Sequence, residues 1–76
     1  MDRQLAIKHL EQAERHVALG EKHITRQREL IAQMEHGGHD TATAVDLLRI
    51  FELVQQNHVA DRDRIRAELA NPVCLD

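Results

Sequence analysis

Residues 30–54, LIAQMEHGGHDTATAVDLLRIFELV, decide the fold because they contain the only glycine pair of the chain. Gly37 and Gly38 stand at its centre, and adjacent glycines are strong breakers of regular structure. On both sides of the pair, the chain is rich in Ala, Leu, Glu, Gln, Arg and Lys, which are good helix formers. The stretch therefore predicts two helices joined by a short turn.

Residues at the ends of these segments predict where each helix begins and ends. Asp2 and Asp40 can act as N-caps, and Gly37 can take the left-handed conformation that follows a helix. Pro72 cannot continue the second helix. A turn this short makes the two helices antiparallel, so we predict an all-α hairpin that forms one domain. Its expected parts are a helix over about residues 2–35, a turn over 36–40, a helix over about 41–70 and a frayed tail over 71–76.

Residues spaced alternately three and four apart predict a coiled-coil-like seam between the helices. Antiparallel pairing sets Ile24 near Phe51, and it sets the small residues Ala13 and Gly20 opposite bulky polar ones. We interpret Gly20 as a place where the helices approach closely. The seam residues are Ala6, Leu10, Ala13, Val17, Gly20, Ile24, Gln27, Ile31 and Met34 in the first helix, and Ala44, Leu48, Phe51, Gln55, His58, Arg62, Ile65 and Leu69 in the second.

Residues 45–54 are too apolar to be covered by one partner helix, since seven of the ten are apolar. A 76-residue chain with a single cysteine also lacks the disulfides that often stabilise small domains. We therefore expect a two-fold homodimer, a four-helix bundle; docking on a different protein is the alternative. The expected interface residues are Leu30, Met34, Leu47, Ile50, Phe51, Leu53 and Val54.

Six histidines raise the question of a metal site. His9, His16 and His23 are seven residues apart, a rise of about 10.5 Å per step, so they cannot share one ion. His58 and Asp61 have suitable spacing, and antiparallel pairing brings His16 toward them, which gives a candidate zinc or nickel site. We prefer to interpret the polar seam residues as setting the register of the helices. These residues are His16, His23, Gln27, Gln55, His58 and Arg62.

The histidines also suggest a second hypothesis, that the protein responds to pH. Imidazoles beside a partly buried seam would resist protonation, because desolvation disfavours the charged form. The dimer would then lose stability between neutral pH and about pH 5. Metal binding or pH response by the histidines is thus the first alternative to a purely structural role.

Composition disfavours several classes of function. The chain has no Ser, Tyr or Trp and no glycine-rich phosphate loop, so we expect no enzyme activity and no cofactor. The net charge of −3 disfavours nucleic acid, and the run from Asp61 to Arg66 alternates in sign. Pairs three or four apart, such as Asp61–Arg64, Asp63–Arg66 and Arg64–Glu68, can form there. A weak nucleic-acid-associated regulator remains the second alternative.

The sequence contains a run of distinctive residues, HVxxGExHIxxQRxLI from His16, followed by GHDT, LLxxFExxQxxH and DRDR. This run resembles that of a group of short bacterial α-helical proteins to which no activity has been assigned. The resemblance covers most of the chain and implies a small helical protein. It implies no catalytic residue or cofactor, and it directs attention to the polar residues His16, Glu21, His23, Gln27, Arg28, His58 and Arg62.

These observations favour a non-enzymatic helical hairpin that dimerises and acts through protein–protein contacts, as an adaptor or regulatory module. No apolar run approaches the roughly 20 residues that a membrane span needs. The N-terminal residues lack the apolar core of a signal peptide. A single cysteine also fits a reducing compartment. We therefore expect a cytoplasmic protein whose main partner is a second copy of itself.

Overall fold

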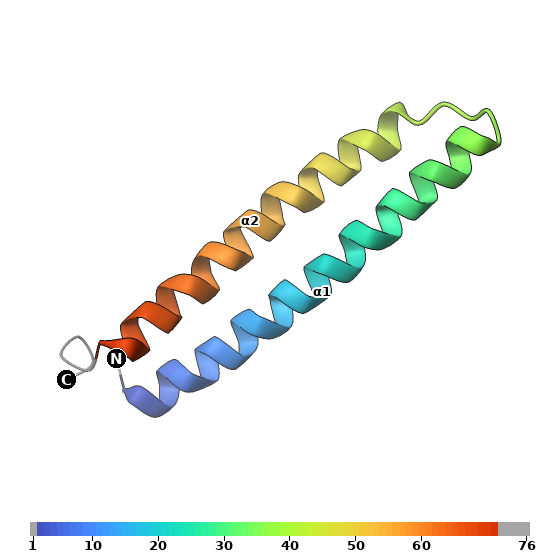
Figure 1. Ribbon diagram of the computed structural model, residues 1–76. Coiled ribbons are helices and arrows are strands. Elements are labelled where there is room, and N and C mark those ends of the chain that lie inside the picture. The colour runs from blue at the N-terminus through green and yellow to red at the C-terminus, as the bar shows by residue number, and fades with distance from the viewer. Residues whose placement is uncertain (1, 72–76) are drawn as a thin grey trace.

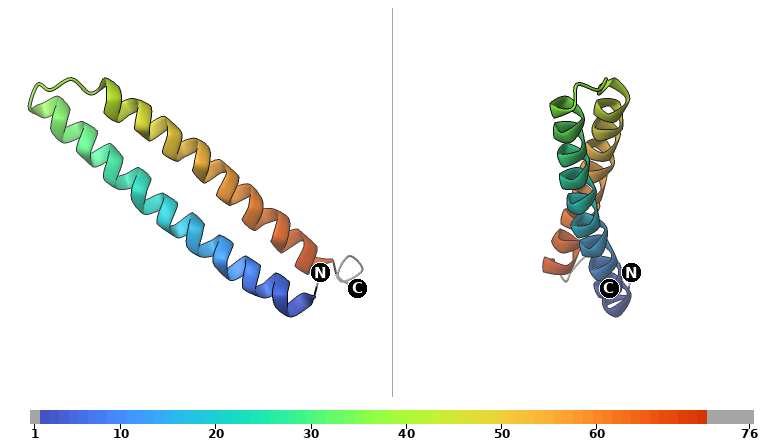
Figure 2. Two further views of the ribbon diagram at one scale, coloured as in Figure 1. Left: turned by 180° about the vertical axis from the view of Figure 1, so that it is seen from behind. Right: turned by 90° about the vertical axis from the view of Figure 1, so that its right-hand side faces the viewer.

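The computed structural model describes residues 2–71 of the chain. Two helices, α1 (Arg3–His36) and α2 (Ala42–Ala70), run antiparallel and lie side by side along their whole length (Figures 1 and 2). The prediction of an all-α hairpin is confirmed, and no strand occurs in residues 2–71. The tail expected to fray from Pro72 onward, which includes Cys74, lies outside the described residues.

The turn places its left-handed glycine one residue later than predicted. Gly37 has a right-handed conformation, with φ −83°, whereas Gly38 has φ 75°. This geometry lets the Gly38 amide donate to the Glu35 carbonyl and the His39 amide donate to the Met34 carbonyl. The two bonds form a Schellman motif. In this motif, the residue with positive φ comes directly before the residue whose amide bonds back to the last turn of the helix. Here these two residues are Gly38 and His39. The assignment to Gly37 was therefore wrong.

The predicted caps are only partly right. Asp2 occupies the N-cap position of α1, but its side chain makes no capping hydrogen bond. Helix α2 begins at Ala42, so Thr41 rather than Asp40 is its N-cap residue. The Asp40 carboxylate nevertheless accepts a hydrogen bond from the Ala42 amide at 3.0 Å. That bond satisfies one of the free amides in the first turn of α2.

The predicted seam forms the contact between the helices. Every seam residue in both helices is buried or half-buried, as the alternating spacing predicted. The most buried members are small or medium in size, since Ala6, Ala13 and Ala44 are among them with Val17, Ile31 and Ile65. None of the large side chains among the described residues is fully buried. The core of the hairpin is thus narrow, because it consists only of the seam residues between the two helices.

The hairpin is a rod of 58 × 14 × 13 Å with a radius of gyration of 17.1 Å. A compact domain of this length has a radius of gyration of about 11 Å. Because the described part of the chain forms a single pair of helices, much of each helix surface is open to solvent. In the described part of the chain, neither helix is long and apolar enough to cross a membrane.

Candidate functional site

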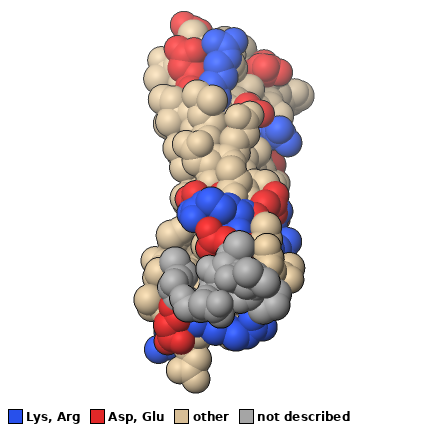
Figure 3. Space-filling model, turned by 90° about the vertical axis from the view of Figure 1, so that its left-hand side faces the viewer, with Lys and Arg blue, Asp and Glu red and all other residues tan. Residues whose placement is uncertain are grey.

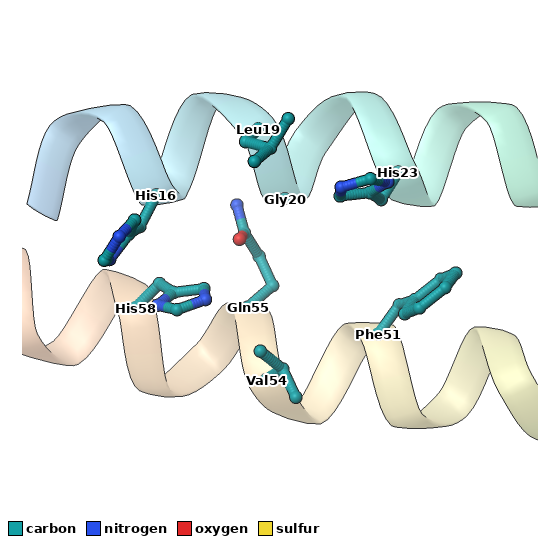
Figure 4. Close-up of a pocket in the computed structure, with 8 residues that line it drawn as sticks. All are labelled: His16, Leu19, Gly20, His23, Phe51, Val54, Gln55 and His58. Carbon is teal, nitrogen blue, oxygen red and sulfur yellow. The ribbon is translucent and has the colours of Figure 1, made fainter.

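A groove of about 200 Å³ runs between the two helices near the middle of the hairpin (Figure 4). We call it the histidine groove, because three imidazoles line it together with aliphatic, aromatic and amide groups. Its eight lining residues are His16, Leu19, Gly20, His23, Phe51, Val54, Gln55 and His58. The groove contains no carboxylate, amine or thiol, so its polar chemistry consists of imidazoles and one amide.

Gln55 crosses the floor of the groove and bonds to the opposite helix. Its amide nitrogen donates to the Val17 carbonyl at 2.8 Å. The amide oxygen is buried and has no hydrogen-bond partner among the described residues. That oxygen lies over Gly20, where a β-carbon would stand only 1.8 Å away from it. Gly20 therefore provides the space for the Gln55 amide, which explains the close approach predicted at this glycine.

This contact predicts a strong coupling between positions 20 and 55. In the wild-type background, Gly20→Ala raises the helix propensity, which stabilises the fold by about 1 kcal/mol. The added methyl group also displaces the Gln55 amide from its hydrogen bond to the Val17 carbonyl, and the loss of that bond costs about 1 kcal/mol. In a Gln55→Ala background the same change meets no obstacle. We expect Gly20→Ala to be near neutral alone and to stabilise by about 1 kcal/mol in the second background. Urea denaturation of the four proteins measures the difference, and equal effects in both backgrounds would exclude the contact.

Gln27 makes the matching bond nearer the turn. Its side chain is buried, and its amide nitrogen donates to the Ala44 carbonyl at 2.9 Å. Gln27 and Gln55 thus reach from opposite helices to backbone carbonyls of the other. A shift of one turn between the helices would break both bonds and leave buried amides without partners, which costs free energy. This geometry agrees with the hypothesis that polar seam residues set the register.

The imidazoles form two ring contacts across the seam, both of which Figure 4 shows. The rings of His16 and His58 have centroids 5.1 Å apart and are tilted by 48°. His23 and Phe51 form the second contact at 5.8 Å. His16 and His23 are exposed in the single hairpin, whereas His58 is half-buried. Antiparallel pairing therefore brings His16 to His58 as expected, while His16 and His23 are more exposed than their place beside the seam suggested.

Asp61 does not complete a three-residue metal site with these imidazoles. Its carboxylate lies 3.6 Å from the guanidinium of Arg64 instead. Over residues 2–71, no group of three or more His, Cys, Asp and Glu side chains is placed to hold a metal ion. The described part of a single hairpin thus offers the two imidazoles of His16 and His58 without a third ligand placed beside them.

Exposed aliphatic side chains border the histidine groove on its turn side. Val54 lines the groove, and Ile50 and Leu47 precede it by four and seven residues, which places all three on one stripe of α2. Their exposures are 45%, 54% and 41%. On α1, Leu30 follows His23 by seven residues and lies on the same side, also exposed. We call Leu19, Leu30, Leu47, Ile50 and Val54 the apolar face.

The other predicted interface residues lie differently. Leu53 is 61% exposed. Because neighbouring residues of a helix point to different sides of it and Val54 lines the groove, the Leu53 side chain points away from the groove. Met34 and Phe51 are half-buried in the seam. Leu19 was missed by the sequence analysis, although its position three residues after His16 was a signal that it shares that side of α1. Within the part of the chain that the structure describes, the other large exposed apolar residues are Leu5 and Ile7, near the start of α1.

The charged residues of the run from Asp61 to Arg66 form ion pairs rather than a basic patch. Arg64 lies near both Asp61 and Glu68, as predicted. The predicted pair of Asp63 and Arg66 is wrong: Arg66 reaches across the seam to Glu14 at 3.1 Å, and Asp63 instead contacts Arg62. On the side shown in Figure 3, an uncharged area separates charged groups near the turn from charged groups toward the termini.

Comparison of the chain with family models, with curated proteins and with solved structures gave no match. The groove and the apolar face are therefore interpreted from their own chemistry.

Proposed function

We propose that the hairpin is a non-enzymatic module that pairs with a second copy through its apolar face and acts through protein–protein contacts. The observation that carries this proposal is the row of half-exposed aliphatic side chains beside the groove. Leu47, Ile50 and Val54 each leave more than two fifths of their surface open to water. A contiguous apolar stripe of this kind marks an interface rather than a free surface.

The exposed area of the hairpin supports a second copy as the partner. The chain exposes 5735 Å², whereas a folded monomer of 8.7 kDa exposes about 4,700 Å². The excess of about 1,000 Å² is close to the roughly 800 Å² that each partner buries in a standard interface. Two hairpins packed through one face would make a four-helix bundle and convert the narrow seam into a two-layer core.

The chemistry of the groove supports a binding role over catalysis. Among the described residues, those that line the groove supply three imidazoles and one amide as polar groups, and no hydroxyl, thiol or carboxylate. We extend the proposal to a cytoplasmic setting, on the strength of the single cysteine. Within that setting the bundle would serve as an adaptor or regulatory module.

A concentration series tests the dimer. Because only the folded state dimerises, the midpoint of thermal unfolding should rise as the protein concentration rises. We expect an increase of several degrees for each hundredfold increase in concentration, followed by circular dichroism at 222 nm. A midpoint that stays constant from about 1 μM to 100 μM would mean that the hairpin unfolds as a monomer.

A further inference from the structure

The contact between His16 and His58 has the geometry of a pair of metal ligands. The ring centroids are 5.1 Å apart, and the rings come from different helices. Two imidazoles that bind one tetrahedral Zn²⁺, each through a nitrogen about 2.0–2.1 Å from the metal, have centroids about 5 Å apart. Within residues 2–71, neither ring has a hydrogen bond to another side chain or to the backbone. The two imidazoles thus lie opposite one another across the seam, and neither forms a hydrogen bond to another described residue.

Residues 2–71 of one hairpin supply two of the four ligands that a closed zinc site needs. A second copy can supply the other two if its own His16 and His58 lie at the same level. This step rests on the proposed dimer, because the pair lies in the histidine groove beside the apolar face. The shared site requires a dimer that places the His16–His58 pair of one copy opposite the same pair of the second copy.

The distribution of charge along the hairpin selects such an arrangement. Toward the turn, this side carries the apolar residues Leu30, Leu47 and Ile50, with Arg26 and Glu29 beside Leu30, whereas toward the termini a depression that shares His16 is lined by Asp61 and Arg64. A two-fold axis across the middle of the rods would cover the mainly apolar half of one copy with the charged half of the other. That arrangement would desolvate charges against aliphatic side chains, at a cost in free energy. A two-fold axis along the rods instead places the mainly apolar half of one copy against the same half of the second copy.

With the axis along the rods, each residue lies at the same level as its own equivalent in the second copy, so the two His16–His58 pairs lie at one level of the bundle. We propose that His16 and His58 of two hairpins form a shared four-imidazole site for a divalent transition metal of the zinc type. Imidazole is a good ligand for Zn²⁺, Cu²⁺ and Ni²⁺, whereas Mg²⁺ and Ca²⁺ require oxygen ligands, which the groove does not offer as carboxylates. Metal binding would lock the two copies together and regulate the stability of the bundle.

Titration of metal-free, untagged protein with ZnCl₂ tests this site. By isothermal titration calorimetry we expect one Zn²⁺ per two chains, and by absorption spectroscopy we expect Co²⁺ to show the intense visible bands of tetrahedral coordination. His16→Gln removes two of the four ligands from each dimer and should lower the Zn²⁺ affinity at least about 100-fold. His58→Gln should do the same. His39→Gln, which changes an exposed histidine at the turn, is the matched control and should bind Zn²⁺ as the wild type does.

Sedimentation in EDTA and in Zn²⁺ separates failure of this site from failure of the dimer. A dimer in EDTA that binds no Zn²⁺ would overturn the metal site and leave the dimer intact. One ion bound per monomeric chain would overturn the shared site. A monomer in EDTA that becomes a dimer with Zn²⁺ would support the site and contradict a metal-independent dimer, and a chain that is monomeric in both conditions would overturn both proposals. His16 is exposed, so circular dichroism in EDTA should show that His16→Gln folds as the wild type does.

Discussion

Replacing Leu47 and Ile50 together with aspartate is expected to abolish the dimer and to leave an unfolded or molten chain at micromolar concentration. Both side chains lie on the apolar face and are half-exposed in a single hairpin. In the proposed bundle, each aspartate would bring a carboxylate into the interface, which costs several kcal/mol unless it is paired. Since both copies carry the changes, we expect the dimer dissociation constant to rise at least about 1,000-fold.

A charge-matched control separates burial from simple charge repulsion. Gln56→Asp with Ala60→Asp also adds two carboxylates one turn apart on α2, but both positions are exposed and lie outside the histidine groove. This control should remain a folded dimer by size-exclusion chromatography with light scattering. If the two double variants behave alike, the apolar face is not the interface. If Leu47→Asp with Ile50→Asp remains a folded dimer, the same conclusion holds.

Ile65→Ala is expected to cause a large loss of stability without changing the apolar face. Ile65 is 7% exposed, and together with Ala13 it lines a depression in the half of the seam near the termini. Its truncation leaves a cavity where neighbouring small residues cannot fill the space, at a cost of about 2–4 kcal/mol. For a domain of this size, that cost corresponds to a fall of about 10–30 °C in the thermal midpoint.

The matched control for this prediction is Ile7→Ala. Ile7 is 40% exposed, so the same change of side chain removes far less buried surface. Differential scanning calorimetry at one protein concentration should show a much smaller shift for Ile7→Ala than for Ile65→Ala. Equal shifts would show that the seam near the termini contributes little to the fold.

The sequence could predict the seam because helical spacing determines which residues share a side of a helix. The residues in the three-and-four pattern are those that the hairpin buries, including the polar Gln27. Antiparallel pairing around a short turn also placed His16 near His58. These predictions depend only on helix period and turn length, which the sequence states directly.

Features that depend on three-dimensional detail were not predicted. Either of two adjacent glycines could take the positive φ of the turn, and only the bond from His39 to Met34 distinguishes Gly38. Spacing rules find ion pairs within a helix, so they missed the pairing of Arg66 with Glu14 across the seam. The fit of the Gln55 amide over Gly20 depends on distances of a few ångströms between helices. A glycine opposite a glutamine was the available signal.

In our proposal, one hairpin has more apolar surface than it can cover, and a second copy covers the rest. Sedimentation equilibrium of the wild-type chain at micromolar concentration, in EDTA, tests this claim most directly. We predict a particle with twice the mass of the 8.7 kDa chain. A single-copy particle that also unfolds cooperatively would contradict the claim.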